Sequence, residues 1–196
     1  EARRVLVREF GGTLFTIAKD VKFQLEFNPS EVDSYRLIGY ENRLLNDEDF
    51  NDDTKDAGEM GAGHMVTALY EIVPAGSGEQ LPSVDPLKYQ GRGNTLKSSF
   101  MNELLTIKVR YKKPDGKTSM LLEKAVKSSD RGIERASENI RFAAAVAEFG
   151  MILRESEFKG SSTLEGAEAL ARSARGDDED GYRSELIRLI SVAKDM

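Results

Sequence analysis

Hydrophobic residues in this 196-residue chain repeat at every second position before residue 128 and at every third or fourth position after residue 132. The first period is typical of half-buried β-strands, and the second is typical of amphipathic α-helices. Strands that precede helices in sequence form α+β folds, in which the strands pair mainly antiparallel. The sequence therefore predicts an antiparallel β-sheet or sandwich followed by a small packed group of about three C-terminal helices.

Two segments show the strand period most clearly. In Val21–Phe27 and Leu105–Lys112, apolar residues alternate with polar ones, and we expect the odd-numbered residues of both to face the core. The turn sequence Pro114-Asp115-Gly116 follows the second segment and predicts a hairpin to Met120–Val126. Three further strands are expected at Leu14–Ala18, Tyr35–Arg43 and Met65–Val73.

Three amphipathic helices are predicted after the polar linker at Ser128–Gly132. Ser137 is placed to cap the first of them, because a serine side chain at this position accepts a backbone N–H that would otherwise lack a partner. One face of this helix carries four large apolar residues that we expect to be buried: Phe142, Val146, Phe149 and Leu153.

The second and third helices have their own start and stop signals. Ser162 and Glu165 have the spacing of a capping box, and the helix that they open is expected to run through Ala174 until Gly176 ends it. The acidic residues at 177–180 precede the third helix, where negative charge is favoured by the helix dipole. The expected apolar face of the third helix consists of Tyr182, Leu186, Leu189, Ile190 and Ala193.

These patterns divide the chain into three predicted parts. Residues 1–20 begin with a helix at Glu1–Phe10 that has no capping residue ahead of it, which indicates the C-terminal remnant of an upstream domain. Residues 21–130 form a β-rich domain, and residues 131–196 form a helical subdomain that we expect to pack on it. Within the β-rich domain, Pro74–Asn102 is rich in proline and glycine and is expected to be irregular.

The formal net charge of −6 is concentrated in one place. From Glu41 to Glu59 eight acidic residues face two basic ones, whereas the rest of the chain has equal numbers of each sign. A net acidic chain lacks the basic surface that nucleic acids require, so we expect no nucleic-acid partner. The sequence has no run of about 18 apolar residues, so we expect no transmembrane segment in this chain.

Five aspartates of the acidic segment form a candidate site for a cation or a partner: Asp47, Asp49, Asp52, Asp53 and Asp56. An EF-hand is excluded, because Asp52 and Gly58 stand where that loop needs glycine and glutamate. Repulsion among the carboxylates leaves three outcomes: solvation, pairing with arginines such as Arg36 and Arg43, or neutralisation by a bound cation such as calcium. We expect solvation of the carboxylates, because it has the lowest free-energy cost, and calcium binding is the alternative.

The sequence contains partial matches to catalytic and cofactor-binding motifs, but each match lacks a residue that the motif requires. Gly116-Lys117-Thr118-Ser119 looks like the end of a phosphate-binding loop, but Tyr111 stands where that motif needs its first glycine. In Gly58–His64 the histidine replaces the essential lysine, and Gly61-Ala62-Gly63 is expected to form a turn. His64 is the only histidine, which excludes two-histidine zinc motifs. We therefore expect no catalytic residues, metal or cofactor, although residue types alone leave glycosidase-like chemistry open.

Two stretches of the chain resemble a known family. They are Thr13–Pro29, which reads TLFTIAKDVKFQLEFNP, and above all Tyr35–Pro74, which reads YRLIGYENRLLNDEDFNDDTKDAGEMGAGHMVTALYEIVP. The segments YKKPDG, RFAAAVAEFG and GYRSELIRL fit the same family, so the resemblance covers nearly the whole chain. The family that it resembles is the uncharacterised C-terminal domain that follows a von Willebrand factor type A domain in bacterial envelope proteins.

The resemblance implies a setting more than a mechanism. Such proteins are typically exported or lipid-anchored, which implies a periplasmic or cell-envelope location. The preceding von Willebrand type A domain carries a metal-dependent adhesion site with an Asp-x-Ser-x-Ser loop, and no such loop occurs in this chain. Residues 1–20 would then be the end of that domain. The family offers no catalytic residues for the part of the protein that this chain represents.

The leading hypothesis is a non-enzymatic interaction or scaffolding module in envelope protein assembly or adhesion. Its expected partners are proteins, including the upstream von Willebrand type A domain. The alternative is a carbohydrate-binding or hydrolase-like domain that uses the acidic loop at 46–59. A pocket with converging carboxylates and an aromatic platform would favour the alternative, whereas a flat apolar patch would favour protein contact.

Overall fold

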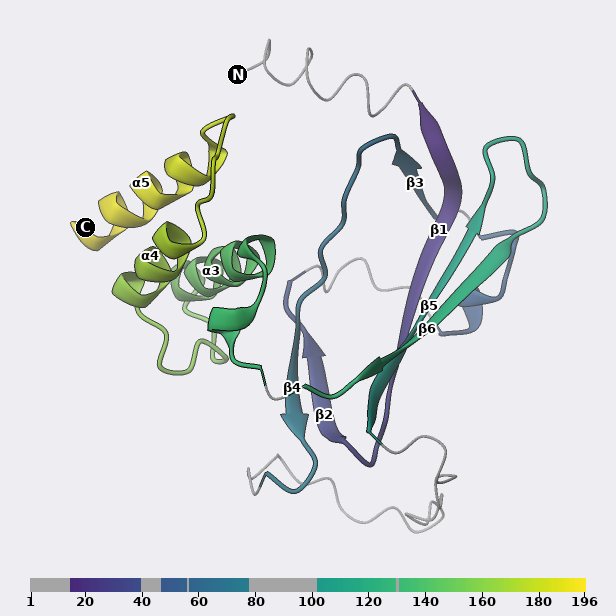
Figure 1. Ribbon diagram of the computed structural model, residues 1–196, viewed down its shortest axis with the longest axis horizontal. Helices are drawn as coiled ribbons and strands as arrows, with labels where there is room; N and C mark the ends of the chain where they lie inside the picture. Colours follow the sequence, from purple (N-terminus) through teal and green to yellow (C-terminus); the bar gives the residue numbers. More distant parts are fainter. Residues whose placement is uncertain (1–14, 40–46, 56, 78–101, 130) are drawn as a thin grey trace. The chain divides into compact units, whose positions relative to one another are not determined.

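The structure, a computed structural model, describes residues 15–39, 47–55, 57–77, 102–129 and 131–196 (Figure 1). Strands come first in the chain and three α-helices come last, so the predicted α+β class is confirmed. The residues cluster into two units. The β unit contains most of the chain up to Ser128, and the helical unit contains residues 129–196 together with residues 37–39 and 67–69.

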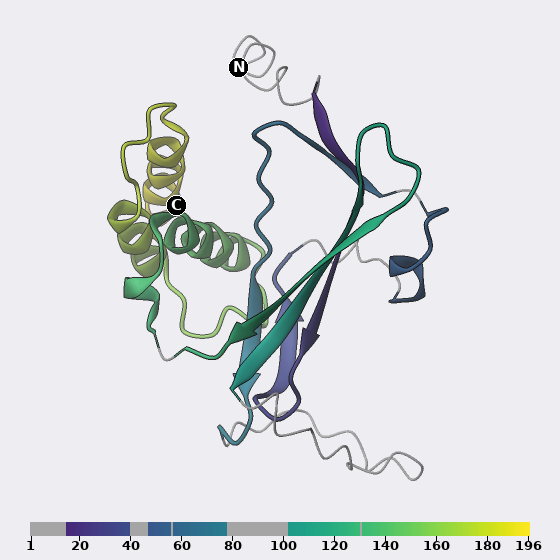
Figure 2. The same cartoon turned by 45° about the vertical axis from the view of Figure 1, so that its right-hand side comes forward.

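The main sheet of the β unit has the strand order β3-β1-β5-β6, and all three pairings are antiparallel. Its strands are β1 (Thr16–Phe27), β3 (Gly58–Gly61), β5 (Glu103–Lys112) and β6 (Met120–Lys127). The predicted hairpin between β5 and β6 is confirmed, and its turn closes where the Gly116 N–H donates to the Lys113 carbonyl at 2.9 Å. Figure 2 shows β5 and β6 as a long twisted hairpin beside β1.

Strand β1 joins two segments that the sequence predicts as separate strands. Its register with β5 shifts between Lys19 and Lys22, and Asp20 has a positive φ of 49°. These are the features of a β-bulge, which bends a strand without ending it. The strand therefore continues across residue 20, where the sequence places a domain boundary, and residues 16–20 lie in the main sheet.

A second sheet pairs β2 (Val32–Leu37) with β4 (Tyr70–Pro74). Its aromatic residues meet the end of β1, since the Phe27 ring stacks on Tyr35 with centroids 4.1 Å apart and lies 5.6 Å from Tyr70. The strand predicted at 35–43 begins three residues earlier, and residues 40–43 lie outside the described part. The strand predicted from residue 65 is wrong before residue 70, because residues 65–69 lie in no strand of either sheet among the described residues.

Strand β3 was not predicted, because Gly-Glu-Met-Gly shows no apolar alternation. It pairs with the start of β1, with Gly61 opposite Thr16 and Gly58 opposite Val21. The turn predicted at residues 61–63 follows it directly. The His64 N–H donates to the Gly61 carbonyl at 3.1 Å, and Gly63 has a φ of +80° that favours glycine.

The helical unit consists of α3 (Glu138–Leu153), α4 (Leu164–Ser173) and α5 (Tyr182–Lys194), preceded by a short 3-10 helix, η4 (Ile133–Arg135). Its core combines small and large residues: Ala145, Phe149, Ala167, Ala171, Ile187 and Ile190. The alanines let the helix axes approach closely, and Ile190 fills the space between them as the largest fully buried side chain. None of the helices in the described ranges is long and apolar enough to cross a membrane.

The cap of α3 is confirmed, and that of α4 is shifted by one residue. Ser137 accepts the Ile140 N–H at 3.4 Å. At the start of α4 the cap is Thr163 rather than Ser162, and its Oγ1 accepts the Gly166 N–H at 3.0 Å. The Ser162 prediction is wrong because two adjacent hydroxyl residues satisfy the same pattern, and only the backbone geometry selects one of them.

The start of α5 is stabilised by an acidic residue, as predicted. The Asp178 carboxylate accepts the Arg183 N–H at 3.0 Å and the Ser184 N–H at 2.7 Å. The hydrogen bond from the Ser184 side chain is the main reason that the pKa of Asp178 lies below its ordinary value, and these two backbone N–H groups lower it further. Gly181, the residue before the helix, has no side chain that could cap it, and Asp178 caps the helix instead.

The buried faces of α3 and α5 are rotated from the predicted ones. Val146 and Leu153 are exposed, and Ala145 is buried instead. On α5, Leu189 is exposed and Ile187 is buried beside Ile190. A pattern of large apolar residues misplaces these faces, because the small residues of the core allow the closest helix packing.

Candidate functional site

The described part of the acidic loop before β3, residues 47–55, begins with the 3-10 helix η2 (Asp47–Phe50). It lies beside the main sheet in both views (Figures 1 and 2). Phe50 is buried, and the Arg110 guanidinium of β5 lies 5.7 Å from the centre of its ring. A buried aromatic side chain thus anchors a loop whose sequence is otherwise almost entirely polar.

Lys22 of β1 holds the backbone of this loop. Lys22 is only 3% exposed, and its Nζ donates to the carbonyl oxygens of Asp49 at 3.0 Å and Asp52 at 2.5 Å. A buried ammonium group costs free energy unless its donors have acceptors, and the two carbonyls supply them. Carbonyl oxygens are also ligands that a calcium ion uses. The ammonium of Lys22 therefore occupies a position in which a loop of this kind would hold a cation.

Two basic residues of β5 continue this arrangement. The Lys112 Nζ donates to the Asp53 carbonyl at 2.9 Å and pairs with the Asp20 carboxylate at 2.7 Å. Arg110 donates to the Asn51 side-chain oxygen at 3.1 Å and lies 3.9 Å from the Asp53 carboxylate. Together with Lys22, these residues bring three positive charges from the sheet to the acidic loop.

The candidate aspartates have separate surroundings. Asp52 accepts the Thr54 N–H at 2.8 Å and its hydroxyl at 2.6 Å, and these hydrogen bonds lower the pKa of Asp52. The Asp49 carboxylate lies 3.5 Å from the Lys55 Nζ, and the side chain of Asp53 is exposed. The side chain of Asp47 and all of Asp56 lie outside the described residues. Within the described ranges, no group of three or more acidic, histidine or cysteine side chains is placed to hold a metal ion.

The cations that meet the loop differ from the arginines that the sequence indicates. Arg36 forms an ion pair with Glu71 of β4, and Arg43 lies outside the described residues. Lys22, Arg110 and Lys112 lie about 27 to 59 positions from the groups that they contact, so no local pattern predicts them.

The edge strand β6 is a second candidate surface, which the sequence reasoning missed. It ends the main sheet, and no strand of the described residues pairs with its outer side. Nearly all of its residues are exposed, including the consecutive apolar residues Met120, Leu121 and Leu122. Three apolar residues in a row depart from the alternation of a half-buried strand, and this was the available signal.

A row of apolar side chains crosses one face of the main sheet from β6 to β1. Cross-strand pairs place Phe23, Val109 and Leu122 side by side, and Tyr111 pairs with Met120 next to them. Phe23 is 49%, Met120 41% and Leu122 56% exposed. The prediction that Phe23 faces the core is therefore wrong, because the acidic loop covers the opposite face, on which Lys22 lies. We call these five residues the apolar row.

Comparison with known proteins gives the family of this chain. The family model described as "Uncharacterized protein YfbK, C-terminal" matches residues 12–196. The chain belongs to this family. The YfbK match includes all of β1, so the family's own bounds also extend past residue 20 toward the N-terminus.

One relative of this chain is the Escherichia coli (strain K12) protein named "Uncharacterized protein YfbK". The two are 44% identical over 193 residues, which are 98% of this chain and 32% of the relative. The chain thus spans about a third of the length of that relative. No solved structure matches the chain.

Proposed function

We propose that this chain is a non-enzymatic interaction module and that it binds protein through the apolar row and the edge strand β6. The observation that carries this proposal is the exposure of large apolar side chains next to an unpaired strand edge. Burial of apolar surface against a partner is favourable by roughly 25 cal/mol per Å². Contiguous exposed apolar residues on a folded protein therefore favour a contact surface.

The edge strand favours a particular mode of contact. Its outer N–H and C=O groups can pair with an extended segment of another protein, while alternate side chains of that segment meet the apolar row. Lys124 and Lys127 lie on the same strand as Met120 and Leu122 and provide a charged rim. An extended segment with apolar residues at every second position fits this surface best.

The wider setting belongs to the same proposal. The sequence resemblance supports a module that accompanies a von Willebrand factor type A domain in envelope protein assembly or adhesion. The relative is about three times as long as this chain, which leaves room for such a domain. In this proposal the whole protein acts in the periplasm or cell envelope, with a lipid anchor as one means of attachment.

The hydrolase-like alternative would need carboxylates that converge on one cleft. In the described part of the acidic loop, Asp49 pairs with Lys55, Asp52 accepts from Thr54, and Asp53 lies toward Arg110. These carboxylates are engaged with different partners, so no observation favours the alternative.

The test is a crosslinking and capture experiment with the full-length protein. We expect its specific protein partners to be lost when this region is deleted and also when Met120→Asp is combined with Leu122→Asp. The control variant Lys117→Glu, in the turn between β5 and β6, makes a charge change of the same size outside β6 and the apolar row, and it should keep the partners. Circular dichroism checks that all variants fold. Capture of the same partners by all four proteins would sink the proposal.

A further inference from the structure

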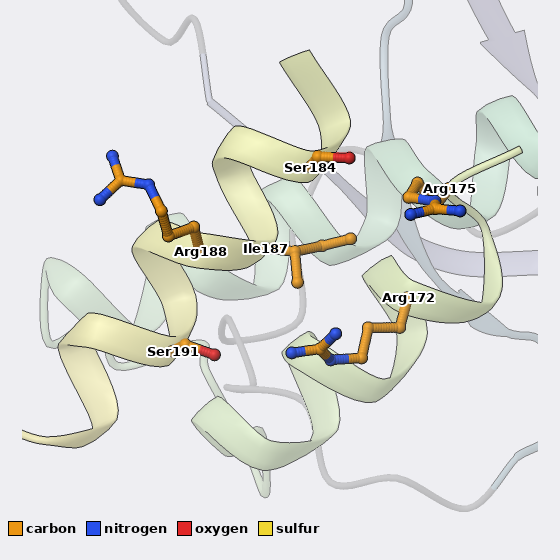
Figure 3. A pocket seen from close by; sticks show the side chains of 6 residues that line it. All are labelled: Arg172, Arg175, Ser184, Ile187, Arg188 and Ser191. Carbon is orange, nitrogen blue, oxygen red and sulfur yellow. The ribbon is translucent and has the colours of Figure 1, made fainter. Parts of the chain in front are cut away.

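A groove of about 440 Å³ lies between α4 and α5 in the helical unit. Its lining is mostly cationic and polar: Arg172, Arg175, Ser184, Ile187, Arg188 and Ser191. The volume falls within the range of about 300–1,000 Å³ that small-molecule sites occupy. Figure 3 shows Arg172 and Arg175 on the α4 side with Ile187 of α5 near them, whereas Arg188 points away from α4. Arg172 and Arg175 are therefore the two guanidinium groups of interest.

Arg172 is fixed in place by a neighbouring carboxylate. Its Nε and Nη2 donate to Glu168 Oε1 at 2.9 and 2.6 Å. Glu168 also accepts hydrogen bonds from Lys194 at 2.9 Å and from Ser191 at 2.8 Å. These hydrogen bonds lower the pKa of Glu168 to about 2, and that from Lys194 has the largest effect. Glu168 is thus ionised at neutral pH and orients Arg172. Lys194 also lies 3.8 Å from the Glu165 carboxylate, so the charges of this cluster are balanced.

Arg175 and Arg188 are the other two arginines that line the groove. Arg175 lies near Asp178, whose carboxylate is already used by the N–H groups at the start of α5. Arg188 is exposed, and among the described residues it has no ion pair. Three arginines and no acidic residue thus line the groove.

We propose that this groove binds a small organic oxyanion, either a carboxylate or a phosphate ester. Guanidinium groups donate two parallel hydrogen bonds to such groups, and charged hydrogen bonds of this kind are about twice as strong as neutral ones. Ile187 supplies an apolar floor for the carbon part of the ligand, which a free inorganic ion would not use. The proposal is independent of the protein contact through β6, because the groove lies in the other unit.

The experiment is an NMR titration of the whole chain, with ionic strength held constant by sodium chloride. Inorganic phosphate and succinate are the two probes, and backbone amide shifts are the readout. We expect saturable shifts at residues 172–191 with at least one probe. Arg175→Gln should weaken binding about tenfold, because it removes one charged hydrogen-bond donor without disturbing the Glu168 cluster. Arg135→Gln in η4 is the control with the same charge change.

The two probes separate the two ligand chemistries. Saturable shifts with succinate alone assign the groove to carboxylates, and those with phosphate alone assign it to phosphate esters. Equal binding by wild type and Arg175→Gln, or shifts no larger than those that chloride causes, would overturn the proposal. An unchanged thermal midpoint of Arg175→Gln shows that a loss of binding reflects the groove and not the fold.

Discussion

The acidic loop of the β unit and the Glu168 cluster of the helical unit place charge inside the fold in opposite ways. At the loop the buried charge is the cation Lys22, and its partners are the backbone carbonyls of Asp49 and Asp52. In the helical unit the buried charge is the anion Glu168, and its partners are the side chains of Lys194, Ser191 and Arg172.

The comparison shows that the number of charges in a segment does not tell which of them stabilises the fold. The acidic loop is the most negative part of the sequence, yet its backbone oxygens rather than its carboxylates are bound by Lys22. The single carboxylate of Glu168 in α4 is bound by three side chains. Substitutions should therefore be tolerated at the loop carboxylates and poorly tolerated at Glu168.

The largest effect is expected in the core of the helical unit. Ile190→Ala should lower the free energy of unfolding by about 2–5 kcal/mol, because it leaves a cavity where Ile190 is fully buried. Denaturant unfolding followed by helical circular dichroism and by hydrogen exchange of β5 amides shows whether this loss reaches the β unit. If the helical subdomain packs on the β domain, both signals shift together. Separate midpoints for the two signals would contradict that packing.

Lys22→Met tests the loop side of the comparison. The substitution keeps the length of the side chain and removes the ammonium that the carbonyls of Asp49 and Asp52 accept, so we expect a loss of roughly 1.5–3 kcal/mol. Amides of residues 49–53 should exchange faster in the same variant. Lys55→Met is the matched control, and its exposed ion pair with Asp49 should contribute about 0–1 kcal/mol. Equal losses from both variants would show that Lys22 has no special role.

The pH dependence of stability tests the Glu168 side. The pKa of Glu168 falls on folding from 4.5 to about 2, so its contribution is complete above pH 4.5 and is lost as the pH falls toward 2. Across this range the melting temperature of wild type should fall more steeply than that of Glu168→Gln. Glu165→Gln, whose exposed carboxylate lies 3.8 Å from the Lys194 Nζ, is the control and should follow wild type. Parallel curves for wild type and Glu168→Gln would refute the assignment.

What the sequence predicts and what it misses follow from the range of the interactions. The β5–β6 hairpin and the Ser137 cap depend on residues a few positions apart, and both are confirmed. The burial of Lys22 depends on a loop about 30 positions away, and this contact reverses the predicted burial of Lys22 and Phe23 in β1. The arginine groove likewise depends on the packing of α4 against α5. Periodicity gives the elements, whereas their non-local contacts decide which faces are buried.

Calcium titration of the wild-type protein tests most directly whether Lys22 takes the place of a bound cation at the acidic loop. Because its ammonium already binds the carbonyls of Asp49 and Asp52, we expect excess calcium to leave the melting temperature unchanged and to produce no saturable heat in calorimetry. A dissociation constant near or below about 1 mM, abolished by Asp52→Asn combined with Asp53→Asn, would contradict this and establish the loop as a cation site.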